Sequence, residues 1–246
     1  MLEVKHVFQS YVKGRQKKEV LHDVSFNCPR GEDIAIIGES GSGKPTLGRL
    51  VLGIEKPKSG VVLLDGKPVD VLENRSGKMS AVFQNYTSSL HPYFSVKQLI
   101  EEPLIHAEPK MPSKQRLSRI MNLLEDVGLD ESYLKRYPKM LSGGEAQRIA
   151  IARSISTYPN YIMLDEAISS LDMSIQVQIL DLLKYLKEKH QLSYIFITHD
   201  IQTAVYLCKK IIVFKEGKIQ ETLMREVLYQ SDNKYVKQLL NKQLMD

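Results

Sequence analysis

The chain has 246 residues, with 34 Lys+Arg against 29 Asp+Glu, which gives a formal net charge of +5. Its 43% hydrophobic and 26% charged residues are ordinary for a soluble globular protein and exclude collagen-like, coiled-coil and intrinsically disordered chains. The length allows one large domain or two small ones, and no apolar run is long enough to cross a bilayer or to form a signal peptide.

The first third is predicted to consist of strands separated by turns. β-forming residues cluster at 2–8, 20–26 and 33–38, with a Pro-Arg-Gly-Glu turn before the last of these segments. A Gly/Ser-rich loop follows, and apolar residues then recur at helical spacing over residues 44–54. After another turn, residues 61–64 are predicted to form a further strand.

The middle and final thirds have different patterns. From residue 96 to 157 apolar side chains recur at helical spacing, and no strand is predicted there. The elements predicted after that are a strand at 161–164, a helix at 174–189, strands at 194–198, 210–214 and 218–221, and short helices to the end. This order predicts an α/β domain with an inserted helical subdomain and a parallel sheet buried on both faces.

The positive charge permits an acidic partner, and nucleotides, nucleic acid and an anionic membrane leaflet all fit it. Basic residues are spread along the chain except at 13–18, a run that we interpret as a solvated loop rather than a nucleic-acid patch. Cys28 and Cys208 are the only cysteines, and they form no cluster with histidines. No disulfide framework or zinc site is therefore indicated, and a reducing, cytosolic setting is expected.

A phosphate-binding loop is predicted between the strand at 33–38 and the helix at 44–54. Glycines let backbone N–H groups turn inward around an anion, the helix N-terminus adds its positive dipole end, and the lysine reaches the terminal phosphates. A flexible Gly/Ser turn is the alternative, but a strand before, a helix after and the offset of the lysine favour a nucleoside triphosphate. The predicted cradle consists of Gly38, Glu39, Ser40, Gly41, Ser42, Gly43, Lys44, Pro45 and Thr46.

Pro45 departs from the phosphate-loop pattern. A Ser or Thr is expected directly after the lysine because its hydroxyl coordinates Mg²⁺, and proline has neither a hydroxyl nor an N–H. Proline is acceptable in a first helical turn, although it biases Lys44 away from helical dihedrals. Thr46 is the candidate substitute for the metal ligand, but one residue along a helix rotates a side chain by about 100°. We therefore predict weakened Mg²⁺ binding and slowed hydrolysis.

The strand at 161–164 ends in two carboxylates, Asp165 and Glu166. In proteins with a phosphate loop, such a strand delivers an aspartate that holds Mg²⁺, and the adjacent glutamate can polarise an attacking water. The pair alone is a weak signal, and the phosphate loop upstream strengthens it.

A second Ser/Gly anion nest opens the helix predicted at 145–156. Residues 141–148 read Leu-Ser-Gly-Gly-Glu-Ala-Gln-Arg, so Ser142, Gly143 and Gly144 offer backbone N–H groups at a helix N-terminus. One ATP does not need two such nests from one chain. The pattern therefore predicts a dimer in which each nest closes over a nucleotide held by the other subunit.

As a set, these motifs resemble those of the ATP-binding subunits of ABC transporters, whose signature is the Leu-Ser-Gly-Gly-x-x-Gln run. The resemblance covers about residues 2–240. It implies a P-loop NTPase of the ABC ATPase type, with a mainly parallel core sheet, an antiparallel β subdomain and an inserted helical subdomain. It further implies one ABC ATPase domain over 1–246, a helical subdomain at 86–157, a short C-terminal helical extension at 223–246, and ATP and Mg²⁺ as cofactors.

The resemblance also implies catalytic and metal-binding roles. Glu166 is expected to polarise the attacking water, His199 to contact the γ-phosphate, and Lys44 to act on the same phosphates. Gln84 looks like the glutamine that touches Mg²⁺ and senses the membrane subunit, and Asp165 is expected to share the metal.

Two further residues are assigned to nucleotide binding by the same resemblance. Asp172 closes the Ser-Leu-Asp run at 170–172, which matches the segment that communicates across the dimer. Tyr11 is the candidate for stacking on adenine, and an ordinary strand-end tyrosine is its alternative.

Residues 84–104 resemble the peptide/nickel importer branch, whose members carry Gln-Asp-Pro-x-x-Ser-Leu-Asn-Pro-Arg-x-Thr-Val followed by Glu-Pro-Leu. The positions that match are Ser89, Leu90, Pro92, Val96 and 102–104, and those that depart are Asn85, Tyr86, His91 and Tyr93. The tail at 233–240 resembles the branch's His-Pro-Tyr-Thr-x-x-Leu-Leu ending. The cysteine cluster of some relatives is absent, which argues against an iron–sulfur site.

The branch implies a peripheral subunit at the cytoplasmic face of the cell membrane. Its expected partners are a second ATPase subunit, two membrane permease subunits and, indirectly, an extracytoplasmic substrate-binding protein. The second ATPase subunit is commonly a different chain, and a homodimer of the isolated chain is the alternative. Closure on two ATP molecules would pull on the permeases near 84–104, and hydrolysis would reset the dimer. The cargo, whether peptide, nickel or a metal chelate, is selected by the partners, and no nucleic-acid partner is expected.

Three alternatives compete with the interpretation as an importer ATPase. A non-hydrolysing or degenerate regulatory subunit of a heterodimeric ABC complex is favoured by Pro45 but opposed by Glu166, His199 and the signature run. A soluble ABC ATPase acting on ribosomes or DNA normally carries two cassettes or a long coiled-coil insertion. An exporter ATPase does not account for the importer-like stretch at 84–104.

Overall fold

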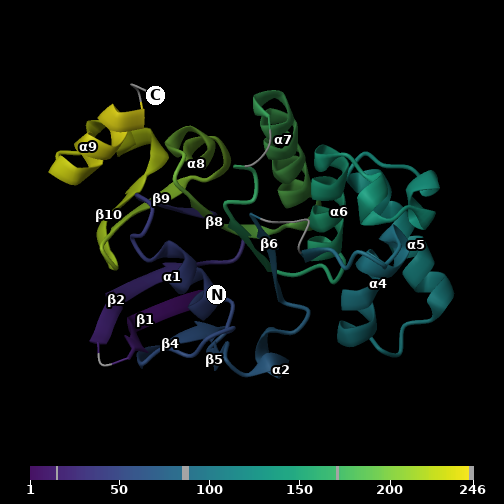
Figure 1. Ribbon diagram of the computed structural model, residues 1–246, viewed down its shortest axis with the longest axis horizontal. Helices are drawn as coiled ribbons and strands as arrows, with labels where there is room; N and C mark the ends of the chain where they lie inside the picture. The colour runs from purple at the N-terminus through teal and green to yellow at the C-terminus, as the bar shows by residue number, and fades with distance from the viewer. Residues whose placement is uncertain (15, 85–88, 170–171, 244–246) are drawn as a thin grey trace. The chain divides into compact units, whose positions relative to one another are not determined.

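The computed structural model describes residues 1–14, 16–84, 89–169 and 172–243. The chain forms two compact units, of which the first comprises Met1–Arg75 with Ser193–Asp246 and the second comprises Ser76–Leu192. Figure 1 shows both units, with labels on most of their helices and strands.

The first unit contains an antiparallel sheet with the strand order β2-β1-β4-β5. Its strands are β1 (Leu2–Lys13), β2 (Gln16–Cys28), β4 (Ser59–Leu64) and β5 (Lys67–Pro68), and the short helix α2 (Leu72–Arg75) follows them. β1 pairs with β2 from one end to the other, and Leu2, Val4 and Val7 on it are buried. β1 thus continues beyond the predicted end at residue 8, because β2 supplies hydrogen-bond partners along its whole length.

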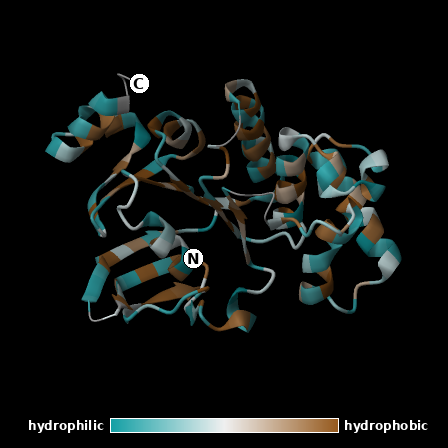
Figure 2. Ribbon diagram, viewed as in Figure 1, coloured by the Kyte–Doolittle hydropathy of each residue, from teal (hydrophilic) through white to brown (hydrophobic). Residues whose placement is uncertain are grey.

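The same unit contains four further strands, in the order β10-β9-β3-β8. They are β3 (Ile34–Ile37), β8 (Ser193–Thr198), β9 (Lys210–Lys215) and β10 (Lys218–Met224), accompanied by α1 (Lys44–Val51), α8 (Ile201–Leu207), the 3₁₀ helix η3 (Arg225–Gln230) and α9 (Lys234–Gln243). β3 runs parallel to both β8 and β9. Every residue of β3 and β8 is buried, as a parallel sheet covered on both faces requires, and apolar residues follow one another along β8 in Figure 2.

The second unit combines two parallel strands with helices. Its elements are β6 (Met79–Phe83), α4 (Val96–Ala107), α5 (Ser113–Asp126), the 3₁₀ helices η1 (Glu131–Lys135) and η2 (Pro138–Met140), α6 (Gly143–Ile155), β7 (Tyr161–Asp165) and α7 (Met173–His190). α7 buries Ile179, Leu182 and Leu186, which recur at helical spacing, together with Leu180 and Leu183, and Figure 2 shows the apolar and polar faces of this helix.

The predicted fold class is confirmed, with parallel strands, an antiparallel sheet and a helical segment all present. The strand Met79–Phe83 was not predicted, and it is formed by parallel pairing with β7. The helix expected at 145–156 begins instead at Gly143, because Ser142 caps it. The division into a subdomain at 86–157 and an extension at 223–246 stays a prediction.

Replacing Ile36 with Ala should lower the free energy of unfolding by roughly 2–5 kcal/mol, because this side chain is completely buried in β3 and its loss leaves a cavity. Ile54→Ala is the matched control, since Ile54 is 56% exposed, and it should change the stability by less than about 0.5 kcal/mol. Urea denaturation of the two variants measures the difference, and equal losses would contradict the placement of β3 in the core.

Candidate functional site

The phosphate loop leaves the end of β3 through a position that accepts only glycine. A Cβ on Gly38 would lie 2.1 Å from the carbonyl oxygen of Phe214 in β9, so any larger residue would collide with backbone. Further along, the carbonyl oxygen of Ser42 accepts a 2.8 Å hydrogen bond from the N–H of Gly217, in the turn between β9 and β10. The β9–β10 hairpin therefore holds the loop at two points.

The interior of the loop suits an anion. Gly41 and Gly43 have φ angles of 80° and 103°, a left-handed conformation that turns the backbone towards the start of α1. Lys44 is buried, and its Nζ donates to the carbonyl oxygens of Gly38 at 2.6 Å and Glu39 at 2.9 Å. Among the described residues the buried Oγ of Ser42 has no hydrogen-bond partner. An ammonium, an unsatisfied hydroxyl and a helix N-terminus fit the phosphates of a nucleotide.

Pro45 occupies the first turn of α1 with an exposed ring. The helix nevertheless begins at Lys44, because N–H groups of a first turn have no helical partner and proline loses nothing there. The hydroxyl that a metal would need at position 45 is absent. The next hydroxyl, Thr46 Oγ1, is buried and accepts a 3.2 Å hydrogen bond from the guanidinium of Arg49. This hydrogen bond occupies a lone pair of the hydroxyl that a metal ion would need, which makes Thr46 a poor replacement ligand.

His199 leaves β8 at the sheet edge where the phosphate loop leaves β3. The parallel register pairs Ile37 with Thr198, so the residues that follow each of them, Gly38 and His199, lie at neighbouring strand ends. Asp200 then caps α8, accepting from the N–H groups of Gln202 at 2.8 Å and of Thr203. His199 is exposed. Strand end and capped helix together fix the backbone that presents its imidazole.

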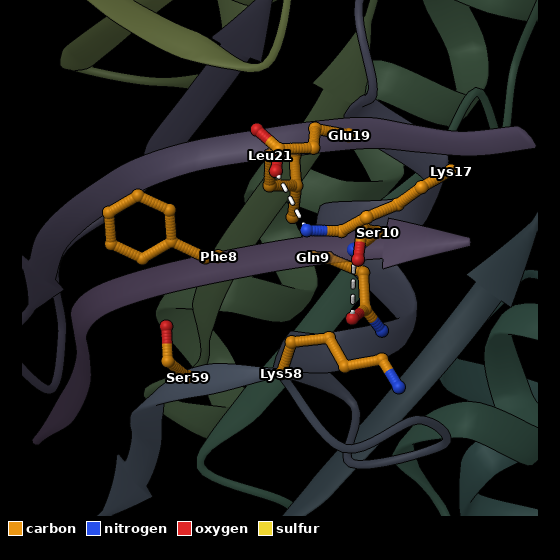
Figure 3. A pocket seen from close by; sticks show the side chains of 8 residues that line it. All are labelled: Phe8, Gln9, Ser10, Lys17, Glu19, Leu21, Lys58 and Ser59. Carbon is orange, nitrogen blue, oxygen red and sulfur yellow. Dashed lines mark hydrogen bonds and ion pairs between the residues drawn. The ribbon is translucent and has the colours of Figure 1, made fainter. Parts of the chain in front are cut away.

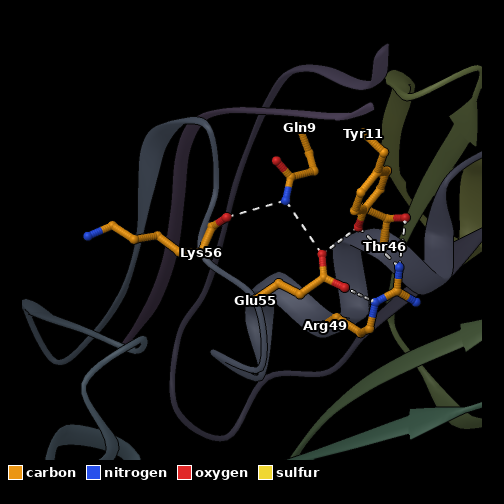
Figure 4. A network of polar contacts seen from close by, with 6 residues as sticks. All are labelled: Gln9, Tyr11, Thr46, Arg49, Glu55 and Lys56. Atoms are coloured by element: carbon orange, nitrogen blue, oxygen red, sulfur yellow. Dashed lines mark hydrogen bonds and ion pairs between the residues drawn. The ribbon is translucent and has the colours of Figure 1, made fainter. Parts of the chain in front are cut away.

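Tyr11 lies near the end of β1 and is 38% exposed. Its hydroxyl donates to Glu55 and accepts a 3.2 Å hydrogen bond from Arg49, as Figure 4 shows. The ring borders a hollow of about 550 Å³.

The remaining predicted members of the phosphate loop, Glu39 and Ser40, are exposed.

In the second unit the register of β6 and β7 brings three predicted residues to one edge. Phe83 pairs with Asp165, so Gln84 and Glu166 follow neighbouring strand ends. The Nε2 of Gln84 donates to Ser169 Oγ at 3.3 Å, and that hydroxyl donates to the carbonyl oxygen of Glu166 at 3.0 Å. Glu166 has a φ of 46°, a left-handed conformation that costs energy in a non-glycine residue and is common at functional positions.

The signature run forms a capped helix N-terminus. Ser142 Oγ accepts from the N–H of Glu145, and the Glu145 carboxylate accepts a 2.7 Å hydrogen bond from the N–H of Ser142. The hydroxyl of Tyr133 donates to the same carboxylate, and this bond holds the pKa of Glu145 below its usual value. The carboxylate therefore stays ionised at the entrance to α6, with the backbone of Gly143 and Gly144 beside it in the first turn.

Gln147 is a residue whose structural role the sequence did not indicate. It is completely buried one turn into α6, and its Nε2 donates to the carbonyl oxygen of Ala167 at 2.8 Å. Ala167 directly follows Glu166, so the signature helix holds the segment that carries the predicted catalytic carboxylate. The sequence does show this glutamine as the last residue of the signature motif. Its hydrogen-bond partner, however, lies twenty residues further along the chain, so the contact could not be inferred from the motif.

Asp172 precedes α7 as its N-terminal cap, and its carbonyl oxygen accepts from the N–H groups of Ile175 and Gln176. Ser170 and Leu171, which share its predicted motif, lie outside the described residues, as do residues 85–88 of the importer-like stretch. Within the described residues no group of three or more His, Cys, Asp or Glu side chains could hold a metal ion.

A further hollow of about 260 Å³ lies on the antiparallel sheet and is shown in Figure 3. Its lining residues are Phe8, Gln9, Ser10, Lys17, Glu19, Leu21, Lys58 and Ser59. None of these belongs to the predicted nucleotide site, and two of them, Lys17 and Glu19, form an ion pair.

Comparison with known proteins assigns these motifs to one family. The sequence matches the ABC transporter family over residues 21–169. It is 52% identical to the metal-staphylopine import system ATP-binding protein CntF of Staphylococcus aureus, with 99% of each chain covered. The chain belongs to the ABC transporter family. The resemblance inferred from the motifs is confirmed, and the protein is an ATP-binding subunit with the ABC ATPase fold.

Other relatives agree with this assignment. The oligopeptide transport ATP-binding protein OppF of Bacillus subtilis is 38% identical over 98% of this chain and 81% of its own length. Among solved structures, the dimeric ABC transporter cassette MJ0796 superimposes with a TM-score of 0.82 at 31% identity, covering 92% of this chain and 99% of that one. Within the described residues no helix has both the length and the apolarity that a membrane crossing needs.

Replacing Gln147 with Leu should lower the free energy of unfolding by about 1–3 kcal/mol, because the buried carbonyl of Ala167 loses its donor. The ATPase rate should fall as well, since the segment after Glu166 is released. Gln115→Leu, at an exposed position of α5, is the control and should change neither quantity. Thermal melts and ATPase assays of both variants test this, and an unchanged melting temperature for Gln147→Leu would contradict the contact.

Proposed function

We propose that this chain is the ATP-hydrolysing subunit of an importer that takes up metal ions as chelates. The supporting observation is the 52% identity, over 99% of both chains, with a protein named for metal-staphylopine import. The peptide transporters among the relatives are less similar, at 38% identity for OppF of Bacillus subtilis. The importer-like pattern at 84–104 agrees with either cargo.

The phosphate loop would bind the nucleotide in this proposal. Left-handed glycines turn the backbone inward, Ser42 offers a hydroxyl without a partner, and Lys44 supplies the positive charge. Tyr11 would stack on the adenine. Gln84 and Asp165 would hold Mg²⁺, which when bound neutralises phosphate charge, and Thr46 remains a weaker candidate because of Arg49.

Hydrolysis would depend on residues at the ends of β7 and β8. The Glu166 carboxylate would accept a hydrogen bond from the attacking water and polarise it. His199 would contact the γ-phosphate. The left-handed backbone at Glu166 and the hydrogen bonds from Ser169 and Gln147 around it support a fixed position for this carboxylate.

The chain would work as one of two ATPase subunits bound to two permease subunits at the cytoplasmic face of the membrane. Ser142, Gly143 and Gly144 would then face a nucleotide held by the partner ATPase, and Asp172 would lie at the same interface. The dimeric cassette MJ0796 supports pairing of this kind. Closing of the dimer on ATP would move the permeases, and hydrolysis would reopen it.

Pro45 favours a second candidate, a subunit with a degenerate site in a heterodimer. The presence of Glu166, His199 and the capped signature helix argues for retained hydrolysis. Slow turnover with weak Mg²⁺ binding is the form of the proposal that accommodates all four features.

Glu166→Gln should stop uptake of labelled nickel supplied with staphylopine, in cells that carry the intact transporter. The amide keeps the shape of the side chain but is a poor base, so turnover should fall by about a hundredfold or more while ATP stays bound. Glu125→Gln, at an exposed position of α5, should leave uptake unchanged. Full hydrolysis by Glu166→Gln would refute its role, and loss of peptide uptake alone would indicate a peptide importer.

Pro45→Ser should raise the ATPase rate of the assembled transporter and lower the Mg²⁺ concentration needed for half-maximal activity by about tenfold, because it restores a hydroxyl ligand. Pro45→Ala is the control, since it removes the ring without adding a hydroxyl. If both variants behave alike, the effect comes from the backbone and not from the metal. If Pro45→Ser leaves the rate and the Mg²⁺ dependence unchanged, the predicted weakening is wrong.

A further inference from the structure

Glu55 is the centre of a polar network that joins β1 to α1 (Figure 4). It lies shortly after the C-terminal end of α1, and its carboxylate accepts hydrogen bonds from three side chains. Arg49 donates from Nε at 2.5 Å, Tyr11 donates from its hydroxyl, and Gln9 approaches at 3.5 Å. One carboxylate oxygen is thus bound by the nearby Arg49, and the other by Tyr11 and Gln9 of the distant strand β1.

Arg49 extends this network to the phosphate-loop helix. Its Nη2 donates to the Tyr11 hydroxyl and to Thr46 Oγ1, each at 3.2 Å. Thr46 is two residues from Lys44 and belongs to the predicted cradle. One guanidinium thus contacts the aromatic residue on β1, the carboxylate after α1 and the first turn of α1.

The geometry constrains the tyrosine more than a single surface contact would. A tyrosine near the end of a strand, 38% exposed, is otherwise free to change rotamer. Here its hydroxyl is both a donor and an acceptor, and its partners are charged, which makes the bonds shorter and stronger than neutral ones. Burial alone would raise the pKa of Glu55, but the hydrogen bonds from Tyr11 and Arg49 hold it below its usual value. The carboxylate is therefore ionised at neutral pH and the network is intact.

We propose that Arg49 and Glu55 are positioning residues that hold the Tyr11 ring in one orientation relative to the phosphate-loop helix, and so determine how strongly the site prefers a nucleotide over a bare polyphosphate. This rests on the proposed function, in which Tyr11 stacks on the base. The phosphates would be bound by the phosphate loop itself, so the contribution of the loop to affinity can be measured separately from the contribution of base stacking on Tyr11.

The test compares ATP with inorganic tripolyphosphate, which has the phosphates but no base. Isothermal titration with the whole chain would measure both affinities for Arg49→Lys, Glu55→Gln, Tyr11→Phe and Tyr11→Ala. Arg49→Lys and Glu55→Gln should weaken ATP binding by about three- to tenfold, the effect of losing one or two hydrogen bonds, and leave tripolyphosphate binding unchanged. Tyr11→Phe keeps the aromatic ring but removes the hydroxyl that binds Glu55, so it should weaken ATP binding as much as Glu55→Gln does. The double variant Tyr11→Phe/Glu55→Gln should weaken ATP binding no more than either single variant, because both remove the same contact.

A matched ion pair of the same unit provides the control. Arg225 donates to Glu226 at 3.1 Å on the surface, so Arg225→Lys and Glu226→Gln should leave both affinities unchanged. If Arg49→Lys and Glu55→Gln weaken tripolyphosphate as much as ATP, their role is only structural and the inference is overturned.

The variants also separate this inference from the proposed function. If Tyr11→Ala leaves ATP binding unchanged, the assignment of Tyr11 to the base is wrong and the inference fails with it. If Tyr11→Ala weakens ATP binding and the Arg49 and Glu55 variants do not, the base assignment stands and only the positioning role is overturned.

Discussion

The phosphate loop depends on a close approach between two backbones. Gly38 passes the carbonyl oxygen of Phe214 at a distance that leaves no room for a Cβ, and Gly217 then binds the carbonyl of Ser42. Both contacts come from the β9–β10 hairpin, which contains none of the predicted nucleotide ligands. Because β3 lies between β8 and β9, the same strand packing also determines where His199 emerges. The cradle is therefore a property of the sheet edge and not of the loop alone.

A comparable dependence exists in the second unit, where α6 serves two purposes. Its N-terminus presents the capped signature nest, and Gln147 one turn later holds the backbone that follows Glu166. The hydrogen bond from Gln147 to Ala167 thus joins the helix that presents the nest to the backbone that follows Glu166.

The sequence allowed the local parts of this structure to be predicted, because their signals are local. The phosphate loop has its glycines, and α7 has an apolar stripe that recurs every three to four residues. β6 was missed, since Met79–Phe83 has no strong alternation and becomes a strand by pairing with β7. The network around Glu55 was missed for a similar reason, because Tyr11 lies 44 residues from it in sequence. Contacts of that kind follow from tertiary packing and leave no pattern in neighbouring residues.

Pro45 separates folding from chemistry at one position. It lies in the first helical turn, where a missing N–H has no consequence, and the N–H of Leu47 still binds the carbonyl of Gly43 at 3.0 Å. The features that suit phosphate are intact, namely left-handed glycines, the unsatisfied Ser42 hydroxyl and Lys44. The feature that suits a metal is lost, and the hydrogen bond from Arg49 to Thr46 opposes its replacement by the next hydroxyl. In the proposed function, nucleotide binding and metal-dependent turnover would therefore depend on different atoms of the same loop, and Pro45 would reduce the second without the first.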